Sequence, residues 1–477
     1  MKKWMFLIGL FSSTLAHAQH LEVERLWVSA PKEIHTAVKN KMFYQLDSIR
    51  SDSSSRIQVT VAPDVMFAYQ HKQFKTRLGA HLIVSGNVRS KLAVMGSYRM
   101  GYVNQSLTPY VSQVQAKAFS TNELKTGDYI YHDLRGRISY TPNKVITLQA
   151  GLDHLFVGEG DRSLFVGNQG IASPFAGLKV NFWKLEYHFN QLFLRERVAN
   201  HFSPKASAMH FINFKPTKRW SIGIFESVVY AMKDTLYNRG FELEYLNPLI
   251  FYRPQEYNLG SSDNVLLGVN TSYQWKKNMV YGQLVIDDFF LTEIRARSRY
   301  WASKYGVQLG FKSWIDRAND RFFVRTEMNV VRPFTYSQVN VDNVYGNQSL
   351  ALAHPLGSNF IEFYQEVSWQ RNNWRVESWL QVYLKGLDSA GSNLSLGGDI
   401  YVPYNNRPEE YNFTIGRGIT YRAMNIGILV ARTLFKNTME VFVEPRILVQ
   451  NTEGDVSSRL FFTVGIHRNL GADRRNY

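Results

Sequence analysis

Aromatic and charged side chains that could recognise a ligand gather in three segments of the sequence. Their flat ring faces can stack on sugars, and their planar polar groups can bind hydroxyls or charged substituents. The same side chains could instead tie long connections to one another and to the interior, because such connections must satisfy their own polar groups. The candidate binding residues are Glu159, Asp161 and Arg162 in the first segment, Tyr245, Tyr252, Arg253, Glu256, Tyr257, Asp263 and Asn264 in the second, and Tyr401, Tyr404, Asn405, Arg407 and Tyr411 in the third.

Patterns for catalysis and metal binding are absent from the sequence. The chain has no cysteine, which excludes thiolate chemistry, disulfides and lipid attachment at a cleavage-site cysteine. Its 12 histidines form no HExxH pattern, and there is no GxSxG serine motif. Asp287 and Asp288 are adjacent, and neighbouring strand residues point to opposite faces. We therefore expect a protein that is not an enzyme, with no catalytic residue, no metal and no cofactor.

The first residues have the pattern of a secretory signal peptide. Lys2 and Lys3 precede the apolar stretch Trp4–Phe11, and Ala16-His17-Ala18 is a small-x-small cleavage site. We expect residues 1–18 to be removed and the mature chain to begin at Gln19. Beyond this point no stretch approaches the ~18 apolar residues of a membrane-spanning helix, which leaves a periplasmic protein, a secreted protein or an outer-membrane barrel.

Segments of about ten residues that alternate apolar and polar side chains recur from residue 57 to residue 468. In 145–155, Ile146 and Leu148 lie on one face while Thr147 and Gln149 lie on the other. A soluble β-sandwich gives the same alternation with its apolar face turned inward. A barrel is favoured because the polar faces carry charges of both signs, as a hydrated lumen would, and because aromatic residues make up 14% of the chain. The further clear examples are 305–312, 375–385 and 459–467.

Short polar turns and long connections alternate between these segments. Short periplasmic turns and long extracellular loops distinguish the two ends of an outer-membrane barrel. Eight hairpins, one strand at the start and one at the end predict about eighteen antiparallel strands in a transmembrane barrel over residues 57–477. The predicted turns are at 86–87, 142–144, 183–184, 216–218, 276–278, 316–320, 371–373 and 436–437, and the predicted long connections are at 102–129, 158–173, 195–207, 233–264, 291–304, 333–359 and 386–420.

Residues 19–56 lie outside this pattern, and we expect them to form a small periplasmic segment. Pro31 to Ile49 could form a helix, since Ile34, Val38 and Met42 recur at a spacing of four residues. An extended or disordered segment is the alternative. A helix there would lie at the periplasmic mouth as a plug or docking element.

Charged residues on the polar strand faces should line the lumen. Arginine and glutamate ladders there most simply stiffen the barrel, and the alternative is a lining that selects permeating solutes. These residues are Arg325, Glu327, Arg375, Glu377, Glu440, Glu444 and Arg446.

Several recognisable stretches lie in the loops and in the strands beside them. They are Ile34–Lys39, Leu152–Leu164, Tyr245–Pro254, Gly260–Gly268, Tyr281-Gly282-Gln283 and Asp287-Asp288-Phe289. Together these stretches resemble the capsule assembly Wzi family, especially its branch similar to the gliding-motility protein RemB. One departure is Asn40, where the family pattern has a proline after Lys39.

The resemblance implies an eighteen-stranded outer-membrane barrel of a Gram-negative bacterium that binds and anchors, or helps to assemble, surface polysaccharide. It also implies a possible link to gliding motility, with capsule-export or motility proteins as partners. A diffusion porin or solute channel is the alternative function. The formal charge of +16 would attract anionic polymers and lipopolysaccharide, although a solvated basic surface explains it equally well. We expect contact with outer-membrane lipid and, during biogenesis, with the barrel-assembly machinery, and we expect no nucleic acid partner.

Overall fold

The computed structural model describes residues 38–39, 56–70, 73–88, 91–104, 120–123, 128–198, 201–233, 240, 242–247, 263–434 and 439–467. The predicted signal peptide lies outside these residues. Val38–Lys39 form the short strand β1, which pairs with β8 (Phe156–Val157), so these two residues of the N-terminal segment are extended. Among the described residues, no helix is long and apolar enough to cross a membrane.

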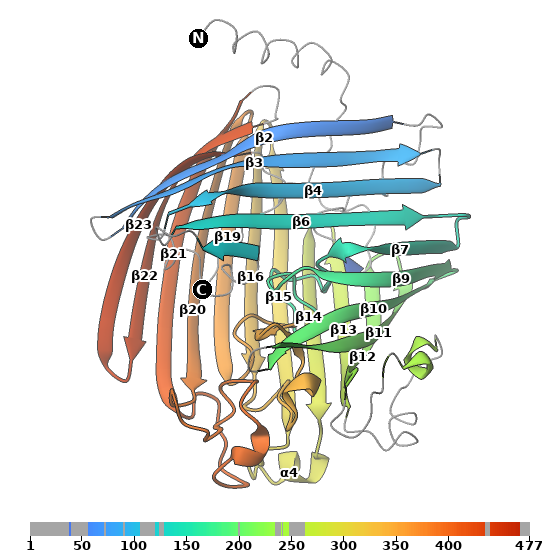
Figure 1. Cartoon of the computed structure of the whole chain (residues 1–477), viewed down its shortest axis with the longest axis vertical. Coiled ribbons are helices and arrows are strands. Elements are labelled where there is room, and N and C mark those ends of the chain that lie inside the picture. Colours follow the sequence, from blue (N-terminus) through green and yellow to red (C-terminus); the bar gives the residue numbers. More distant parts are fainter. Residues whose placement is uncertain are drawn as a thin grey trace, which may run out of the picture.

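Eighteen long antiparallel strands close into a single barrel when β23 pairs with β2, as predicted (Figure 1). Each strand pairs with the one that follows it along the barrel, so the topology is a simple up-and-down meander. The strands are β2 (Arg56–Gln70), β3 (Gln73–Val88), β4 (Leu92–Val103), β6 (Tyr129–Tyr140), β7 (Ile146–Asp153), β9 (Ser173–Phe182), β10 (Leu185–Val198), β11 (His201–Thr217), β12 (Trp220–Ala231), β13 (Asn264–Trp275), β14 (Asn278–Asp288), β15 (Lys304–Arg317), β16 (Asp320–Val331), β19 (Phe360–Arg371), β20 (Trp374–Leu387), β21 (Ile419–Leu434), β22 (Met439–Thr452) and β23 (Asp455–His467).

The remaining elements are short and lie in the connections. The helix α4 and the connection that follows β20 lie together at the lower end of the view in Figure 1. These elements are β5 (Ser120–Glu123), which adds to one edge of β6, η3 (Leu243–Leu246), α4 (Leu291–Arg295), η4 (Val341–Asn343), β17 (Gly346–Asn347), β18 (Leu350–Ala351) and η5 (Tyr404–Asn406).

The barrel is polar inside and apolar outside. Leu309 is 63% exposed, whereas its neighbour Gln308 is fully buried. Leu460 and Thr463 show the same contrast, at 62% and 1%. A soluble sandwich would bury the apolar side chains instead. The alternation predicted from the sequence is therefore confirmed with the apolar face outward, which is the arrangement of a transmembrane barrel.

Most of the predicted turns are tight hairpin connections at the end of the barrel where β2 begins and β23 ends. This end is periplasmic, because short turns and both barrel termini lie there. The predicted turn at 86–87 is placed too early, since Gly86 and Asn87 still pair with β2 and the connection follows Val88. The predicted turn at 436–437 lies outside the described residues.

The predicted long connection at 195–207 is wrong. β10 continues to Val198 and β11 begins at His201, so two residues join them. The run Arg195-Glu196-Arg197 has the composition of a loop, but Glu196 points inward with no exposed surface and pairs with Lys205 at 3.3 Å. Two more extracellular connections, at 71–72 and 453–454, are also short. Charge alone does not end a strand whose inner face is polar.

We expect Leu309→Arg to destabilise the barrel by about 2 to 4 kcal/mol, because the substitution places a charge on the lipid face near the middle of β15. Reversible urea folding into phospholipid vesicles measures this change, and Leu309→Phe is the control that keeps the face apolar. Equal stability of the two variants would contradict lipid exposure of this face.

Candidate functional site

The connection between β7 and β9, residues 154–172, folds into the barrel and is called here the plug loop. Its apolar residues Leu164, Phe165 and Val166 are at most 3% exposed. The Phe165 ring stacks on Phe225 of β12 with centroids 4.5 Å apart. Because the loop starts at β7 and reaches β12 to β19, it crosses the interior of the barrel.

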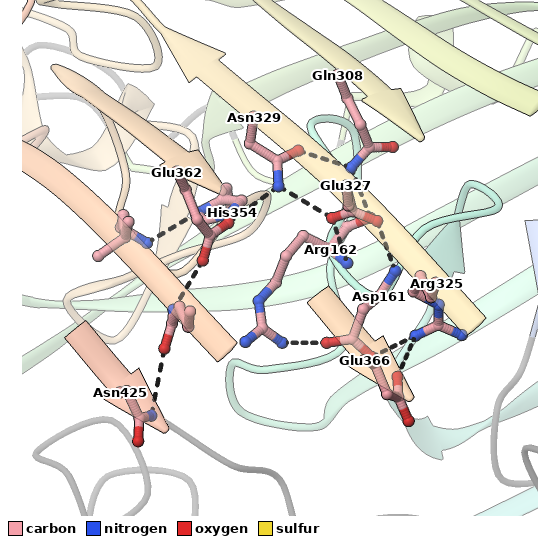
Figure 2. Close-up of polar contacts among 12 residues, drawn as sticks. Asp161, Arg162, Gln308, Arg325, Glu327, Asn329, His354, Glu362, Glu366 and Asn425 are labelled. Atoms are coloured by element: carbon pink, nitrogen blue, oxygen red, sulfur yellow. Dashed lines mark hydrogen bonds and ion pairs between the residues drawn. The ribbon is translucent and has the colours of Figure 1, made fainter. Parts of the chain in front are cut away.

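Glu327 of β16 binds the backbone of the plug loop (Figure 2). Its carboxylate accepts hydrogen bonds from the backbone N–H groups of Asp161 and Arg162, at 2.9 and 3.3 Å. The Tyr281 hydroxyl and the Asn329 amide also donate to it, at 2.8 and 2.9 Å. Glu327 is 1% exposed, and a buried carboxylate needs such donors to offset the loss of water.

Two glutamines extend this contact along the loop. Gln308 of β15 donates to the Arg162 carbonyl at 3.0 Å. Gln283 of β14 donates to the Val157 carbonyl and accepts from the Leu164 N–H, both at 2.9 Å. Together with Glu327, the two glutamines provide hydrogen-bond partners for backbone N–H and carbonyl groups of the plug loop. The loop needs these partners because it has no regular secondary structure beyond β8 and one isolated bridge.

The first candidate segment thus holds the plug in place. Glu159 lies 3.6 Å from Lys312, and Asp161 accepts from Arg325 at 2.8 Å. Arg162 pairs with Asp161 at 2.5 Å and lies over the Tyr364 ring of β19. Glu159 and Arg162 are each 3% exposed, so a polymer outside the barrel has little access to them.

Predicted lumen charges form ion pairs across the barrel wall. Arg325 lies 3.5 Å from Glu366, and Arg375 pairs with both Glu377 and Glu440, the latter at 2.7 Å. A second buried carboxylate, Glu362 of β19, accepts from His354, Asn329 and Gln381 (Figure 2). These contacts join strands to one another and to the connection 332–359, as expected of a stiffening network.

The second candidate segment is divided between described and undescribed residues. Tyr245 has no exposed surface, donates to Asp263 at 2.7 Å and packs on Tyr230 with ring centroids 4.9 Å apart. Asn264 is 1% exposed in β13. These contacts secure the connection to the barrel. Tyr252, Arg253, Glu256 and Tyr257 lie outside the described residues.

Tyr401 of the third segment also has a structural contact. Its hydroxyl donates to the Leu350 carbonyl at 3.1 Å and so ties the connection 388–418 to the connection 332–359. Burial raises the pKa of the Tyr401 phenol well above its usual range, and nearby Glu196 raises it further. The phenol therefore remains a neutral donor at physiological pH.

Tyr404 and Arg407 lie in an accessible cluster that we call the rim patch, which joins two extracellular connections. Trp301 is central to it: Tyr404 packs on its ring at 4.8 Å and the Arg407 guanidinium lies over it at 3.9 Å. Tyr300 contacts Phe290 and Tyr411, with centroids 5.4 Å apart in each pair. Phe290 and Tyr411 are 45% and 46% exposed. The rim patch comprises Phe290, Tyr300, Trp301, Tyr404, Arg407 and Tyr411.

Hydrogen bonds fix the backbone under the rim patch. The Trp301 N–H donates to the Glu410 carbonyl, and the indole N–H donates to the Glu410 carboxylate at 2.6 Å. Arg332, the first residue after β16, donates to the carbonyls of Ser303 and Tyr300 at 2.7 and 3.1 Å. The rings are therefore held in place before any ligand arrives, which lowers the entropy cost of binding.

Phe290, Tyr300 and Trp301 are not among the candidate residues from the sequence. The signal that could have found them is the pair of aromatic runs, Phe289-Phe290 and Tyr300-Trp301, at the two ends of the predicted connection 291–304. Paired rings at both ends of a loop lie close together when the flanking strands are hairpin neighbours. Within the described part of the chain, no group of three or more His, Asp or Glu side chains is arranged to hold a metal ion.

Comparison with known protein families gives no match, and no curated protein matches the sequence. Solved structures do match. The chain is similar to Wzi of Escherichia coli, a carbohydrate-binding β-barrel of the outer membrane involved in group 1 capsule assembly. The two are 12% identical, the match covers 89% of this chain and 85% of that one, and the TM-score is 0.55.

Two further barrels match over most of their length. OprD of Pseudomonas aeruginosa is 10% identical, with 88% and 97% of the two chains covered and a TM-score of 0.45. OccAB4 of Acinetobacter baumannii is 6% identical, with 88% and 98% covered and a TM-score of 0.45. At these identities the likeness to Wzi shows the fold: the chain is a closed eighteen-stranded barrel of the outer-membrane type.

Proposed function

We propose that this barrel resides in the outer membrane and binds a surface polysaccharide at the rim patch, without catalysing a reaction. The observation that carries the proposal is a fixed group of half-exposed aromatic rings, with Arg407 among them, at the extracellular end of a barrel whose interior is crossed by the plug loop.

The chemistry of the rim patch suits sugars. Aromatic rings offer flat apolar faces to the C–H groups of a pyranose, and a planar guanidinium can donate two parallel hydrogen bonds to a carboxylate or to vicinal hydroxyls. Glu410 is exposed beside Arg407 and adds an acceptor, and Asn405 and Asn406 are exposed in η5. A patch on several extracellular connections suits a long polymer better than a small solute.

The plug loop argues against the alternative of a wide diffusion channel. An eighteen-stranded barrel is broad enough for an aqueous interior unless something fills it. Here the plug spans from β7 to β19 and its anchoring residues are buried. The likeness to a carbohydrate-binding barrel also supports polysaccharide binding. Roles in capsule assembly and in motility remain predictions from the sequence resemblance.

We expect the double substitution Tyr300→Ala and Tyr411→Ala to weaken binding of the cell's own capsular or extracellular polysaccharide by roughly tenfold, because two stacking faces are lost. Biolayer interferometry on the purified, reconstituted protein measures this. Trp183→Ala is the matched control, since that ring is 78% exposed at the opposite end of the barrel and should not affect binding. Unchanged affinity of the double variant would contradict a site at the rim patch.

We expect the unmodified protein to give few or no large openings in planar bilayers. Gly160→Ala should increase them, because a Cβ at this position would lie 2.3 Å from Glu327 Oε2 and 2.6 Å from the Arg162 carbonyl. Gly170→Ala, in the same loop, meets its nearest atom at 3.7 Å and should behave as the unmodified protein does. Large stable openings without any substitution would favour the solute channel instead.

A further inference from the structure

An aromatic girdle surrounds part of the periplasmic end of the barrel. Trp220 and Trp374 precede Ser221 and Arg375, which are buried inside, so the two tryptophans point outward. They are 42% and 45% exposed. Such rings lie at the level of lipid headgroups in outer-membrane barrels. The outward rings at this end from β9 to β20 include Phe182, Trp183, Phe214, Trp220, Tyr273, Trp275, Phe311, Phe322, Trp369 and Trp374.

Lysines and arginines lie directly beside this girdle in the tight turns. Lys184 Nζ lies 5.4 Å from the centre of the Trp183 ring, and the Arg432 guanidinium lies 5.3 Å from that of Trp374. These cations therefore share the depth of the aromatic rings. Exposed basic residues at this end of β9 to β21 include Lys184, Lys218, Arg219, Lys276, Lys277, Arg317, Arg371 and Arg432.

Backbone hydrogen bonds show that the turns are neighbours. The Lys184 carbonyl accepts from Lys215 N–H, the Arg219 carbonyl from Gln274 N–H, and the Lys277 carbonyl from Trp314 N–H, all at 2.8 to 2.9 Å. Each turn is thus bonded to the strand that leads to or from the next turn. The cations form one continuous band.

Few carboxylates balance this band. In the turns 183–184, 218–219, 276–277, 316–320 and 371–373, the acidic residues are Asp316 and Asp320. Asp316 pairs with Lys277 at 2.7 Å, and Asp320 lies 4.0 Å from Arg371. Lys184, Arg219, Lys276 and Arg317 have no ion pair with a carboxylate of the described residues. The band carries excess positive charge beside the lipid face.

We infer that this band binds anionic phospholipid headgroups of the periplasmic leaflet. A phosphate of an acidic lipid would lie at the level of the tryptophans, where Lys184 and Arg432 already pack on ring faces. Zwitterionic lipids offer the same phosphate with a compensating ammonium group, so the band should discriminate by net charge. Cations near a membrane surface gain attraction from each anionic lipid, and the gain falls off within a Debye length.

An acidic periplasmic protein or polymer fits the band less well. Its cations surround the outer wall where lipid contacts the barrel, and they alternate with exposed apolar rings such as Phe182, which is 68% exposed. A water-soluble acidic partner would leave those rings in water. The geometry therefore favours lipid as the occupant.

The test uses the full-length protein in nanodiscs containing phosphatidylglycerol and phosphatidylcholine, with the retained lipids counted by native mass spectrometry. We expect the unmodified protein to retain phosphatidylglycerol with roughly fivefold or greater enrichment over the bulk mixture. The triple variant Lys184→Gln, Arg219→Gln and Lys276→Gln should lower this enrichment towards one.

The matched control is Arg295→Gln, Arg297→Gln and Arg299→Gln, which removes the same charge from exposed residues at the extracellular end. It should keep the enrichment, and heat-modifiable migration on gels checks that every variant is folded. Equal loss in both triple variants would overturn the inference, as would an unmodified protein without lipid preference. It would also be overturned if soluble polyglutamate bound these residues in preference to lipid.

Discussion

The structure depends on one buried carboxylate, that of Glu327. Four donors reach it, two from the backbone of the plug loop and two from the barrel wall. If the plug moved away, a buried charge would lose half of these donors, which is costly in a low-dielectric interior. Plug and wall therefore stabilise each other. Once the interior is crossed in this way, the accessible recognition chemistry lies at the extracellular connections rather than along a pore.

The barrel was predictable from the sequence because lipid and a polar interior impose a strict period of two. Leu309 and Gln308 show that period directly, and Pro142 to Lys144 mark a hairpin by turn chemistry. The connection at 195–207 was not predictable from composition, because Arg195 to Arg197 look like a loop although Glu196 is an inward strand residue. When the interior of a protein is itself polar, a run of polar residues can be either a loop or the inward face of a strand, and composition does not distinguish the two.

The candidate site was less predictable than the fold. Glu159, Asp161 and Arg162 have the residue types of a sugar site, yet the loop folds inward and they pair with Lys312, Arg325 and the plug itself. Composition does not reveal the direction in which a loop folds. The rim patch could not be predicted from the sequence. Trp301 and Tyr404 are about a hundred positions apart in the chain, and their rings meet only because two extracellular connections pack against each other.

The sequence separation of the Glu327 contacts limits the order of assembly. Asp161 and Glu327 are 166 residues apart, and the plug also reaches Tyr364 of β19. A chain that adds strands after β7 first gives the plug partial contacts at β12 and β14, and the contacts to Glu327 form only once β16 is in place, so the plug is fully bound late. In an intermediate that lacks β16, the backbone N–H groups of Asp161 and Arg162 have not yet gained their hydrogen bonds to Glu327. Full binding of the plug loop therefore occurs only when the barrel is nearly complete.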